Sequence, residues 1–284
     1  MPRVLIAGCG YVGTALGERL CAAGYDVLGL RRQPPPHAPF PQLSADLGRP
    51  ETLRNLPEVA AVVYTAAADS GSDAAYRAAY VTGLGNLLAA LQDQGQQPRR
   101  LLFTSSTSVY GQQDGEWVDE TSATEPRHFS GRRLLEAEAL LRQTPLPASV
   151  LRLGGIYGPG RTRLIDSVRR GTATCPQGPP RFTNRIHLDD CAGALHHLLE
   201  LPAPEPLYLG VDCEPADSCT VTRWIAAQLG LPEPSVVAAE EAAGVRGGNK
   251  RCRNDRLQAT GYRFRYPSFR EGYGELITAV ASRP

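Results

Sequence analysis

The sequence predicts an α/β fold: a doubly wound parallel sheet with a smaller C-terminal lobe. Over the first half of the chain, short apolar runs alternate with stretches of helix-spaced apolar residues. This alternation is typical of a parallel sheet covered by helices on both faces. After Gly158 the pattern loosens, and no linker separates the halves. We therefore expect a sheet domain over residues 1–158, to which residues 185–211 return, and a smaller lobe over residues 159–284.

The expected strands are apolar runs at residues 4–7, 25–30, 60–66, 100–105, 148–153 and 207–211. Continuous short runs of this kind are typical of strands buried on both faces. Apolar residues at helical spacing predict helices at residues 11–23, 74–94, 131–142, 164–170, 189–201, 221–229 and 268–282. Gly24 follows the first of these helices, at the position where glycine commonly ends a helix.

The net charge, the apolar runs and the cysteines indicate which partners and which cellular compartment to expect. Lys plus Arg is 30 and Asp plus Glu is 29, a net charge of +1, which provides no field to attract nucleic acid or an anionic membrane. No apolar run approaches the roughly 20 residues of a membrane span. The seven cysteines include no C-x-x-C pair, and Met1 leads almost directly into an apolar strand. We therefore expect a cytoplasmic protein without a signal peptide, whose thiols act as small apolar fillers.

The first strand ends in a glycine-rich turn, GCGYVG at residues 8–13, which fits the pattern G-x-G-x-x-G. The turn follows a predicted strand and opens a predicted helix, the context in which this pattern binds a dinucleotide. The first glycine would make the tight turn, the second would admit the pyrophosphate, and the third would let helix and strand pack closely. We expect a Rossmann-type domain whose cofactor-binding residues are Gly8, Gly10, Tyr11, Val12 and Gly13. The alternative is a glycine turn without a ligand.

The end of the second strand predicts which dinucleotide binds. An acidic residue there favours NAD, whereas arginine accommodates the 2′-phosphate of NADP. Arg31 and Arg32 follow Leu30, and no acid is nearby. We therefore expect Arg31 and Arg32 to bind NADP(H), with NAD(H) as the alternative.

Four later segments resemble one known family. They are SSTSVYG at residues 105–111, RLGGIYGPG at 152–160, IHLDDCA at 186–192, and NDRL at 254–257 with Gly261-Tyr262. In this order they are similar to segments of the extended short-chain dehydrogenases/reductases, the NAD(P)-dependent epimerase/dehydratase relatives. The resemblance covers nearly the whole chain. It implies a nicotinamide cofactor, hydride transfer and a small-molecule substrate, and it leaves a homodimer open, since members often dimerise through helices flanking the sheet.

The chain departs from this family at its active site. The family uses Ser or Thr followed by Tyr-x-x-x-Lys on the next helix, and Ser106 falls on the Ser/Thr position. The helix start here reads PRHFSGRRLLE at residues 126–136, with neither Tyr nor Lys, and the only lysine in the sequence is Lys250. The family's asparagine is replaced by Tyr80. The closer match is the atypical subgroup, which keeps the cofactor fold and often lacks the full set of catalytic residues.

Three residues are candidates for the catalytic roles. His128 and Arg132 have the four-residue separation of the missing Tyr and Lys, which on a helix places them on one face. Imidazole titrates near neutral pH, so His128 is the best single candidate for the acid or base. Arg132 could hold a cofactor hydroxyl or phosphate. Ser106 ends a strand at the sheet edge where α/β proteins bind ligands. The plainer interpretation is a loop histidine before a basic helix turn, with Ser106 as a turn residue.

Other candidates lie later in the chain. Tyr157 also closes a strand, where its ring could instead pack under the Gly-Pro turn. Arg161, Arg163 and Arg185 could hold an anionic substrate group. We expect no metal: His187, Asp189 and Asp190 lack further ligands, and an aspartate at a helix start is commonly a cap. The hydrolase pattern G-x-S-x-G is absent.

The residues together predict an NADP(H)-dependent oxidoreductase acting on a small carbonyl, carbinol or nucleotide-sugar-like substrate, through a degenerate active site. The alternative is a non-catalytic NADP(H)-binding sensor or scaffold protein, which the missing Tyr and Lys favour. A third reading, a nucleotide-sugar epimerase, predicts tightly held NAD and no net consumption of cofactor.

Overall fold

The computed structural model describes residues 2–238 and 248–281. The chain divides into two compact units. Unit 1 comprises Met1–Val109, Thr124–Arg152 and Cys191–Tyr208. Unit 2 comprises Tyr110–Ala123, Leu153–Asp190 and Leu209–Pro284. The division differs from the expected boundary at residue 158, because Tyr110–Ala123 belong to unit 2 and the segment returning to unit 1 begins at Cys191.

The central sheet has seven strands in the order β12-β7-β5-β4-β1-β2-β3. These strands are β1 (Arg3–Ala7), β2 (Asp26–Arg31), β3 (Gln42–Ser44), β4 (Ala61–Tyr64), β5 (Leu101–Ser106), β7 (Ala148–Leu153) and β12 (Leu207–Gly210). Neighbouring strands from β3 to β5 run parallel. In register, Ala7 pairs with both Leu30 and Tyr64, and Tyr64 pairs with Phe103. The carboxyl ends of these strands therefore meet at one edge, where such sheets bind ligands.

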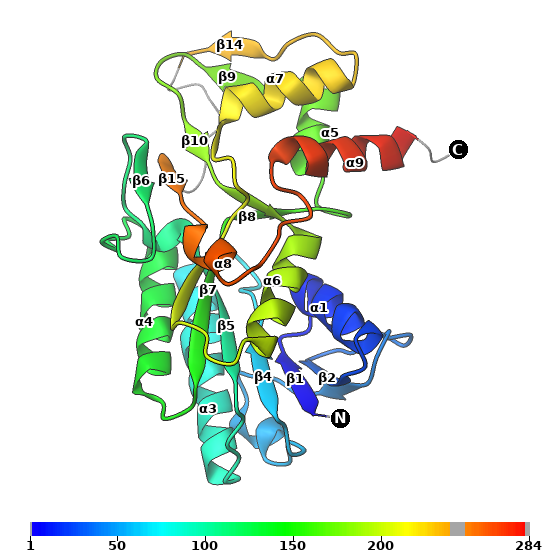
Figure 1. Cartoon of the computed structure of the whole chain (residues 1–284), viewed down its shortest axis with the longest axis vertical. Helices are drawn as coiled ribbons and strands as arrows, with labels where there is room; N and C mark the ends of the chain where they lie inside the picture. Colours follow the sequence, from blue (N-terminus) through cyan, green and yellow to red (C-terminus); the bar gives the residue numbers. More distant parts are fainter. Residues whose placement is uncertain (1, 239–247, 282–284) are drawn as a thin grey trace. The chain divides into compact units, whose positions relative to one another are not determined.

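Helices cover the sheet of unit 1 in two groups. Arg19 of α1 (Tyr11–Ala22) donates to His196 of α6 (Leu188–Glu200) at 3.3 Å. On the other side, α2 (Asp73–Tyr76) leads through a π-helical segment, Arg77–Thr82, into α3 (Gly83–Asp93). Arg133 of α4 (Phe129–Gln143) binds Asp73 at the start of α2 through two hydrogen bonds of 2.8 Å. Figure 1 shows α4 along one side of the sheet and α1 with α6 along the other. The predicted doubly wound α/β fold is confirmed.

The core of unit 2 lies between helices. Apolar residues of α5 (Arg163–Arg169), α7 (Ser218–Gln228) and α9 (Phe269–Ala281) form one buried cluster with Tyr157 and Ala216. A fourth helix, α8, covers Asp255–Ala259. The expected end of the last helix, Ser282, lies outside the described residues.

Short strand pairs join distant segments of unit 2. The pairs are β8 (Gly155–Tyr157) with β11 (Arg185–His187), β9 (Thr174–Pro176) with β14 (Ser235–Val237), β6 (Glu116–Val118) with β15 (Lys250–Cys252), and β10 (Phe182–Thr183) with β13 (Ala216–Asp217). The first three pairs are parallel and the last is antiparallel. Within the described residues, no helix is long and apolar enough to cross a membrane.

Candidate functional site

The glycine loop between β1 and α1 has a different constraint at each glycine. Gly8 has a φ of +86°, and a Cβ there would lie 2.3 Å from the Ala66 backbone. A Cβ at Gly13 would lie 2.7 Å from Thr65 Oγ1, so only glycine lets α1 approach β4 this closely. At Gly10 the nearest atom to an added Cβ is 3.9 Å away, so the space above this residue is open. Gly8 and Gly13 are thus required by the fold itself, whereas Gly10 leaves room for a ligand.

The start of α1 suits an anion. Gly10 is the N-cap, no side chain caps the helix, and its first turn carries no acidic residue. The amides of Gly8 and Cys9 both donate to the Leu30 carbonyl oxygen at 2.9 Å, which ties the loop to the end of β2. An uncapped helix start presents backbone N–H groups and the positive end of its dipole. The loop therefore fits the pyrophosphate of a dinucleotide.

The two arginines at the end of β2 have different surroundings. Arg32 forms a bidentate ion pair with Asp69, with N–O distances of 2.6 and 2.8 Å. Asp69 lies in the loop after β4, and its bond to Arg32 lowers the pKa of its carboxyl. Arg31 is half-buried at the end of β2, and none of the described residues forms a hydrogen bond or ion pair with its guanidinium. Arg31 is thus free to bind an anion, whereas Arg32 already has a partner.

Ser106 is the last residue of β5 and is half-buried. Its hydroxyl oxygen accepts a hydrogen bond from the Ser108 amide at 3.1 Å, which closes the short helical turn Thr107–Val109. A hydroxyl can accept and donate at once, so this bond leaves its proton for another acceptor. A Cβ at Gly131 would lie 2.6 Å from the Ser108 carbonyl oxygen, so the first turn of α4 packs directly on the Ser106 turn.

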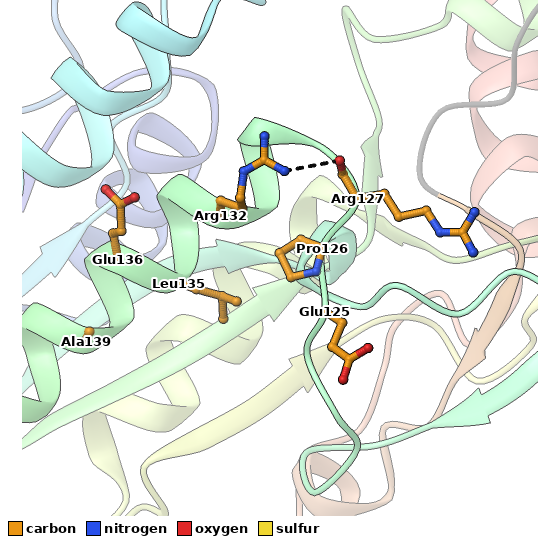
Figure 2. Close-up of a pocket in the computed structure, with 7 residues that line it drawn as sticks. All are labelled: Glu125, Pro126, Arg127, Arg132, Leu135, Glu136 and Ala139. Atoms are coloured by element: carbon orange, nitrogen blue, oxygen red, sulfur yellow. Dashed lines mark hydrogen bonds between the residues drawn. The ribbon is translucent and has the colours of Figure 1, made fainter.

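His128 and Arg132 lie at the start of α4. Helix α4 begins at Phe129, and His128 precedes it as an exposed N-cap residue with extended backbone (φ −107°, ψ 153°). The carbonyl oxygen of His128 accepts a hydrogen bond from the Arg132 amide at 3.3 Å, which is the first bond of the helix. The joint role of the two side chains remains a prediction. Arg132 donates to the Arg127 carbonyl oxygen at 3.3 Å (Figure 2). It lines a surface hollow of about 540 Å³ whose lining does not include His128: Glu125, Pro126, Arg127, Arg132, Leu135, Glu136 and Ala139.

Two further polar groups lie near this edge: Thr65, which the sequence did not indicate, and Tyr80, which replaces the family's asparagine. Thr65, just after β4, donates to the Gly8 carbonyl oxygen at 3.0 Å and supports the glycine loop from below. Tyr80 lies in the π-helical segment, and the centroid of its ring is 5.3 Å from that of the Tyr76 ring. Burial raises the pKa of Tyr80 to about 12. A polar residue at a strand end could have indicated Thr65, but nothing local indicates the π-helical turn.

A buried charged group fixes the strand that carries Ser106. The neighbouring Ser105 donates to Glu138 of α4 at 2.7 Å. Arg152 of β7 binds the same carboxylate through hydrogen bonds of 3.0 and 2.7 Å, and the side chains of Arg152 and Glu138 are 6% and 2% exposed. This group joins β5, α4 and β7 inside unit 1. Mutual hydrogen bonds of this kind are what make buried charges tolerable.

Unit 2 contains the other candidates. Arg185 is buried, and its guanidinium donates to Thr183 through one terminal nitrogen, whereas the other terminal nitrogen has no hydrogen-bond partner in the described part of the chain. Arg161 and Arg163 are exposed. Tyr157 is buried against Tyr273, with ring centroids 4.4 Å apart. The expectation that Arg161, Arg163 and Arg185 form one anion site remains a prediction.

The Asp190 carboxylate has a structural role, because its hydrogen bonds join it to other segments of the protein. Its buried carboxylate accepts hydrogen bonds from the Tyr262 hydroxyl at 2.9 Å and from the Arg265 and Tyr266 amides at 2.8 and 2.9 Å. His187 is also buried, and burial lowers its pKa. In the part of the chain that the structure describes, no group of three or more His, Cys, Asp or Glu side chains is arranged to hold a metal ion.

Unit 1 therefore has the strand, glycine loop and helix arrangement of the dinucleotide-binding class of α/β proteins. The chain belongs to the NAD dependent epimerase/dehydratase family, whose sequence model matches residues 4–208.

Individual relatives agree with this assignment. "Protein YeeZ" from Escherichia coli K12 is 32% identical over 251 residues, which cover 82% of this chain and 86% of the relative. The solved structure of a candidate NAD-dependent epimerase/dehydratase from Methylobacillus flagellatus is 39% identical, covers 99% of both chains and has a TM-score of 0.81. The 3-diazoavenalumate denitrifying reductase of a Streptomyces species is 29% identical over 304 residues, or 96% of this chain and 99% of the relative.

Proposed function

We propose that the protein is an NADP(H)-dependent oxidoreductase that transfers hydride to or from a carbonyl or carbinol carbon of a small molecule. The observation that carries the proposal is the glycine loop: Gly8 and Gly13 are held by contacts within the fold, while the space at Gly10 beside the uncapped start of α1 is open. Membership of the NAD dependent epimerase/dehydratase family and the similarity to a reductase support it.

Arg31 supports NADP(H) rather than NAD(H). Its free guanidinium lies next to Leu30, whose carbonyl oxygen binds the Gly8 and Cys9 amides of the loop. A guanidinium binds phosphate through charge-assisted, often bidentate hydrogen bonds, which would favour the 2′-phosphate. NAD(H) remains the alternative cofactor.

The proposed chemistry uses few side chains. The nicotinamide would supply or accept the hydride. The Ser106 hydroxyl, whose oxygen already accepts a hydrogen bond from the Ser108 amide, would donate a hydrogen bond to the reacting oxygen of the substrate. His128 is the proposed acid or base, since an imidazole ring can both donate and accept a proton. Arg132 would attract a negative group of the cofactor, at the cost of its bond to Arg127.

A second candidate function is cofactor binding without catalysis, as a sensor or scaffold. Helix α4 contains neither tyrosine nor lysine, and the single lysine of the chain, Lys250, is buried in β15 of unit 2. The family's tyrosine and lysine are therefore not replaced by an equivalent pair at the start of α4.

One assay separates these candidates. Purified protein with NADPH is incubated with aldehydes, quinones and nucleotide sugars, and absorbance of the reduced nicotinamide is followed. An oxidoreductase consumes NADPH with at least one of these classes, and Gly10→Val abolishes the consumption. NADPH that binds but is consumed with none of them favours the sensor or scaffold, and NADPH that does not bind overturns both.

A further inference from the structure

An exposed aromatic ring lies on the parallel pair β6–β15 of unit 2. In this pair Trp117 is in register with Arg251. Trp117 is 46% exposed, an unusual position for the largest apolar side chain. Figure 1 shows β6 and β15 adjacent to each other, with β10 close by. Arg251 of β15 therefore contacts two rings, Trp117 of β6 and Phe182 of β10.

The Arg251 guanidinium is held in place by three contacts. Its central carbon lies 4.9 Å from the centroid of the Trp117 ring and 4.7 Å from that of Phe182. Its Nε donates to the Gly115 carbonyl oxygen at 2.6 Å. Cation–π contacts to two rings and a backbone hydrogen bond together restrict a side chain that would otherwise be highly mobile.

The backbone that anchors Arg251 is itself fixed. Gly115 has a φ of +80° and its amide donates to the Asn249 carbonyl oxygen at 3.0 Å. A Cβ at Gly115 would lie 3.3 Å from the Phe182 ring. The Gly115 carbonyl oxygen, which accepts the hydrogen bond from Arg251 Nε, is therefore fixed in the loop before β6, next to β10.

The two terminal nitrogens of Arg251 remain unused. Across residues 2–238 and 248–281, no group accepts a hydrogen bond from either of them. The neighbouring Arg253 also lies over Trp117, at 4.7 Å from the ring centroid, but Asp255 partly neutralises it at 3.6 Å. Arg251 is thus an oriented cation whose hydrogen-bonding fork has no partner among the residues that the structure describes.

We infer that Arg251 and Trp117 form a ligand site that binds a carboxylate or phosphate group attached to a planar ring. A guanidinium fork matches the two oxygens of such an anion, and the exposed part of the indole offers the ring an aromatic contact. Because the arginine is already oriented, little conformational entropy is lost on binding. As a substrate site this inference rests on the proposed oxidoreductase function, to which it adds the class of substrate: a ring-bearing acid or phosphate ester.

The test measures binding without cofactor. The probes are benzoate and phenyl phosphate, which carry the two anions on the same ring, with inorganic phosphate and benzyl alcohol as partial ligands. Trp224→Phe leaves Trp117 as the sole tryptophan and serves as the fluorescence background. Affinities come from quenching of Trp117 and from calorimetry. We expect at least one ring-bearing anion to bind at least about tenfold more tightly than either partial ligand.

Substitutions locate the binding. Arg251→Gln removes the guanidinium fork and should lower the affinity for the ring-bearing anion at least about tenfold. Arg223→Gln is the matched control, because this exposed arginine of α7 pairs with Glu233, at 3.3 Å. This variant should bind the probe like the parent. Preference for phenyl phosphate identifies a phosphate ester as the ligand class, and preference for benzoate identifies a carboxylic acid.

Two outcomes overturn the inference: neither ring-bearing anion binds, or Arg251→Gln binds it as the parent does. The proposed function is separated by titrating NADPH into Arg251→Gln, which should bind it normally, since the glycine loop belongs to unit 1. If the unaltered protein does not bind NADPH, the proposed function is overturned, whereas the inference about the Arg251 site is not affected.

Discussion

The contrast between Arg31 and Arg32 makes a quantitative prediction about cofactor choice. Arg31 has a free guanidinium, whereas Arg32 is bound to Asp69 through two hydrogen bonds of 2.6 and 2.8 Å. A hydrogen bond to a charged group contributes about 1.5–3 kcal/mol, which is roughly a 10- to 150-fold change in affinity. Arg31→Gln should therefore lower the affinity for NADPH by about this factor and leave the affinity for NADH nearly unchanged. Arg31→Asp should reverse the preference between the two cofactors.

Asp69 provides the second half of this prediction. The side chains of Arg32 and Asp69 are 58% and 65% exposed, and exposed ion pairs contribute only about 0–1 kcal/mol. Asp69→Asn frees Arg32, so NADPH should bind up to about fivefold more tightly and NADH should not. Calorimetric titrations of both cofactors at fixed salt measure these changes, with Arg49→Gln, whose side chain is 71% exposed, as the control. Equal affinities of the unaltered protein for NADPH and NADH would refute the reasoning.

Three further predictions concern catalysis and stability. Once a substrate is found, His128→Ala should lower turnover by about 10²–10⁴-fold and flatten the pH–rate profile, whereas Ser106→Ala should lower turnover less and Arg132→Ala should raise the Kd of the cofactor. Normal turnover by His128→Ala together with an inactive Ser106→Ala would contradict this and assign the proton transfer to water or to a substrate group. Arg152→Met leaves the Glu138 carboxylate buried without its cation and should cost about 3–5 kcal/mol in urea unfolding, whereas Arg49→Met should change little. Burial raises the pKa of Asp212 to about 8, above the roughly 3.9 of an unfolded chain, so its contribution to stability is complete below about pH 4 and is lost as pH rises through about 8. Asp212→Asn cannot ionise and should gain stability relative to the parent as pH rises from about 4 to about 8, by up to about 1.4 kcal/mol per pH unit, and a pH-independent difference would contradict this.

The elements of unit 1 could be predicted because their signals are local. The strand predicted at residues 148–153 was found at Ala148–Leu153, and the helix predicted at 189–201 was found at Leu188–Glu200. Burial on both faces makes each strand a continuous apolar run. The glycine spacing at residues 8–13 likewise reflects contacts made by neighbouring elements, so its geometry follows from the sequence pattern.

The short strands of unit 2 could not be predicted in the same way. Strands β10 and β13 have two residues each, and β6 pairs with β15 more than a hundred positions later. Only tertiary pairing defines such strands, and this pairing is also what assigns residues 110–123 to unit 2.

The candidate site shows the same limit. The proposed His128–Arg132 geometry assumed a helix that begins one residue earlier than α4 does. Glu138 lies in the middle of a helix, where a charged residue usually faces solvent, and its burial depends on Ser105 and Arg152 from two different strands. The free fork of Arg251 likewise depends on Trp117, Phe182 and Gly115, none of which is near it in sequence.

The central claim is that the Gly8–Gly13 loop binds a nicotinamide dinucleotide. Calorimetric titration of NADPH into the unaltered protein, Gly10→Val and Gly85→Val tests it most directly. Gly85 of α3 is the matched control, because an added Cβ there meets nothing within 4 Å. We expect saturable binding by the unaltered protein and by Gly85→Val, and none by a folded Gly10→Val, whose side chain would fill the pyrophosphate position. Unchanged NADPH affinity in Gly10→Val would contradict the account.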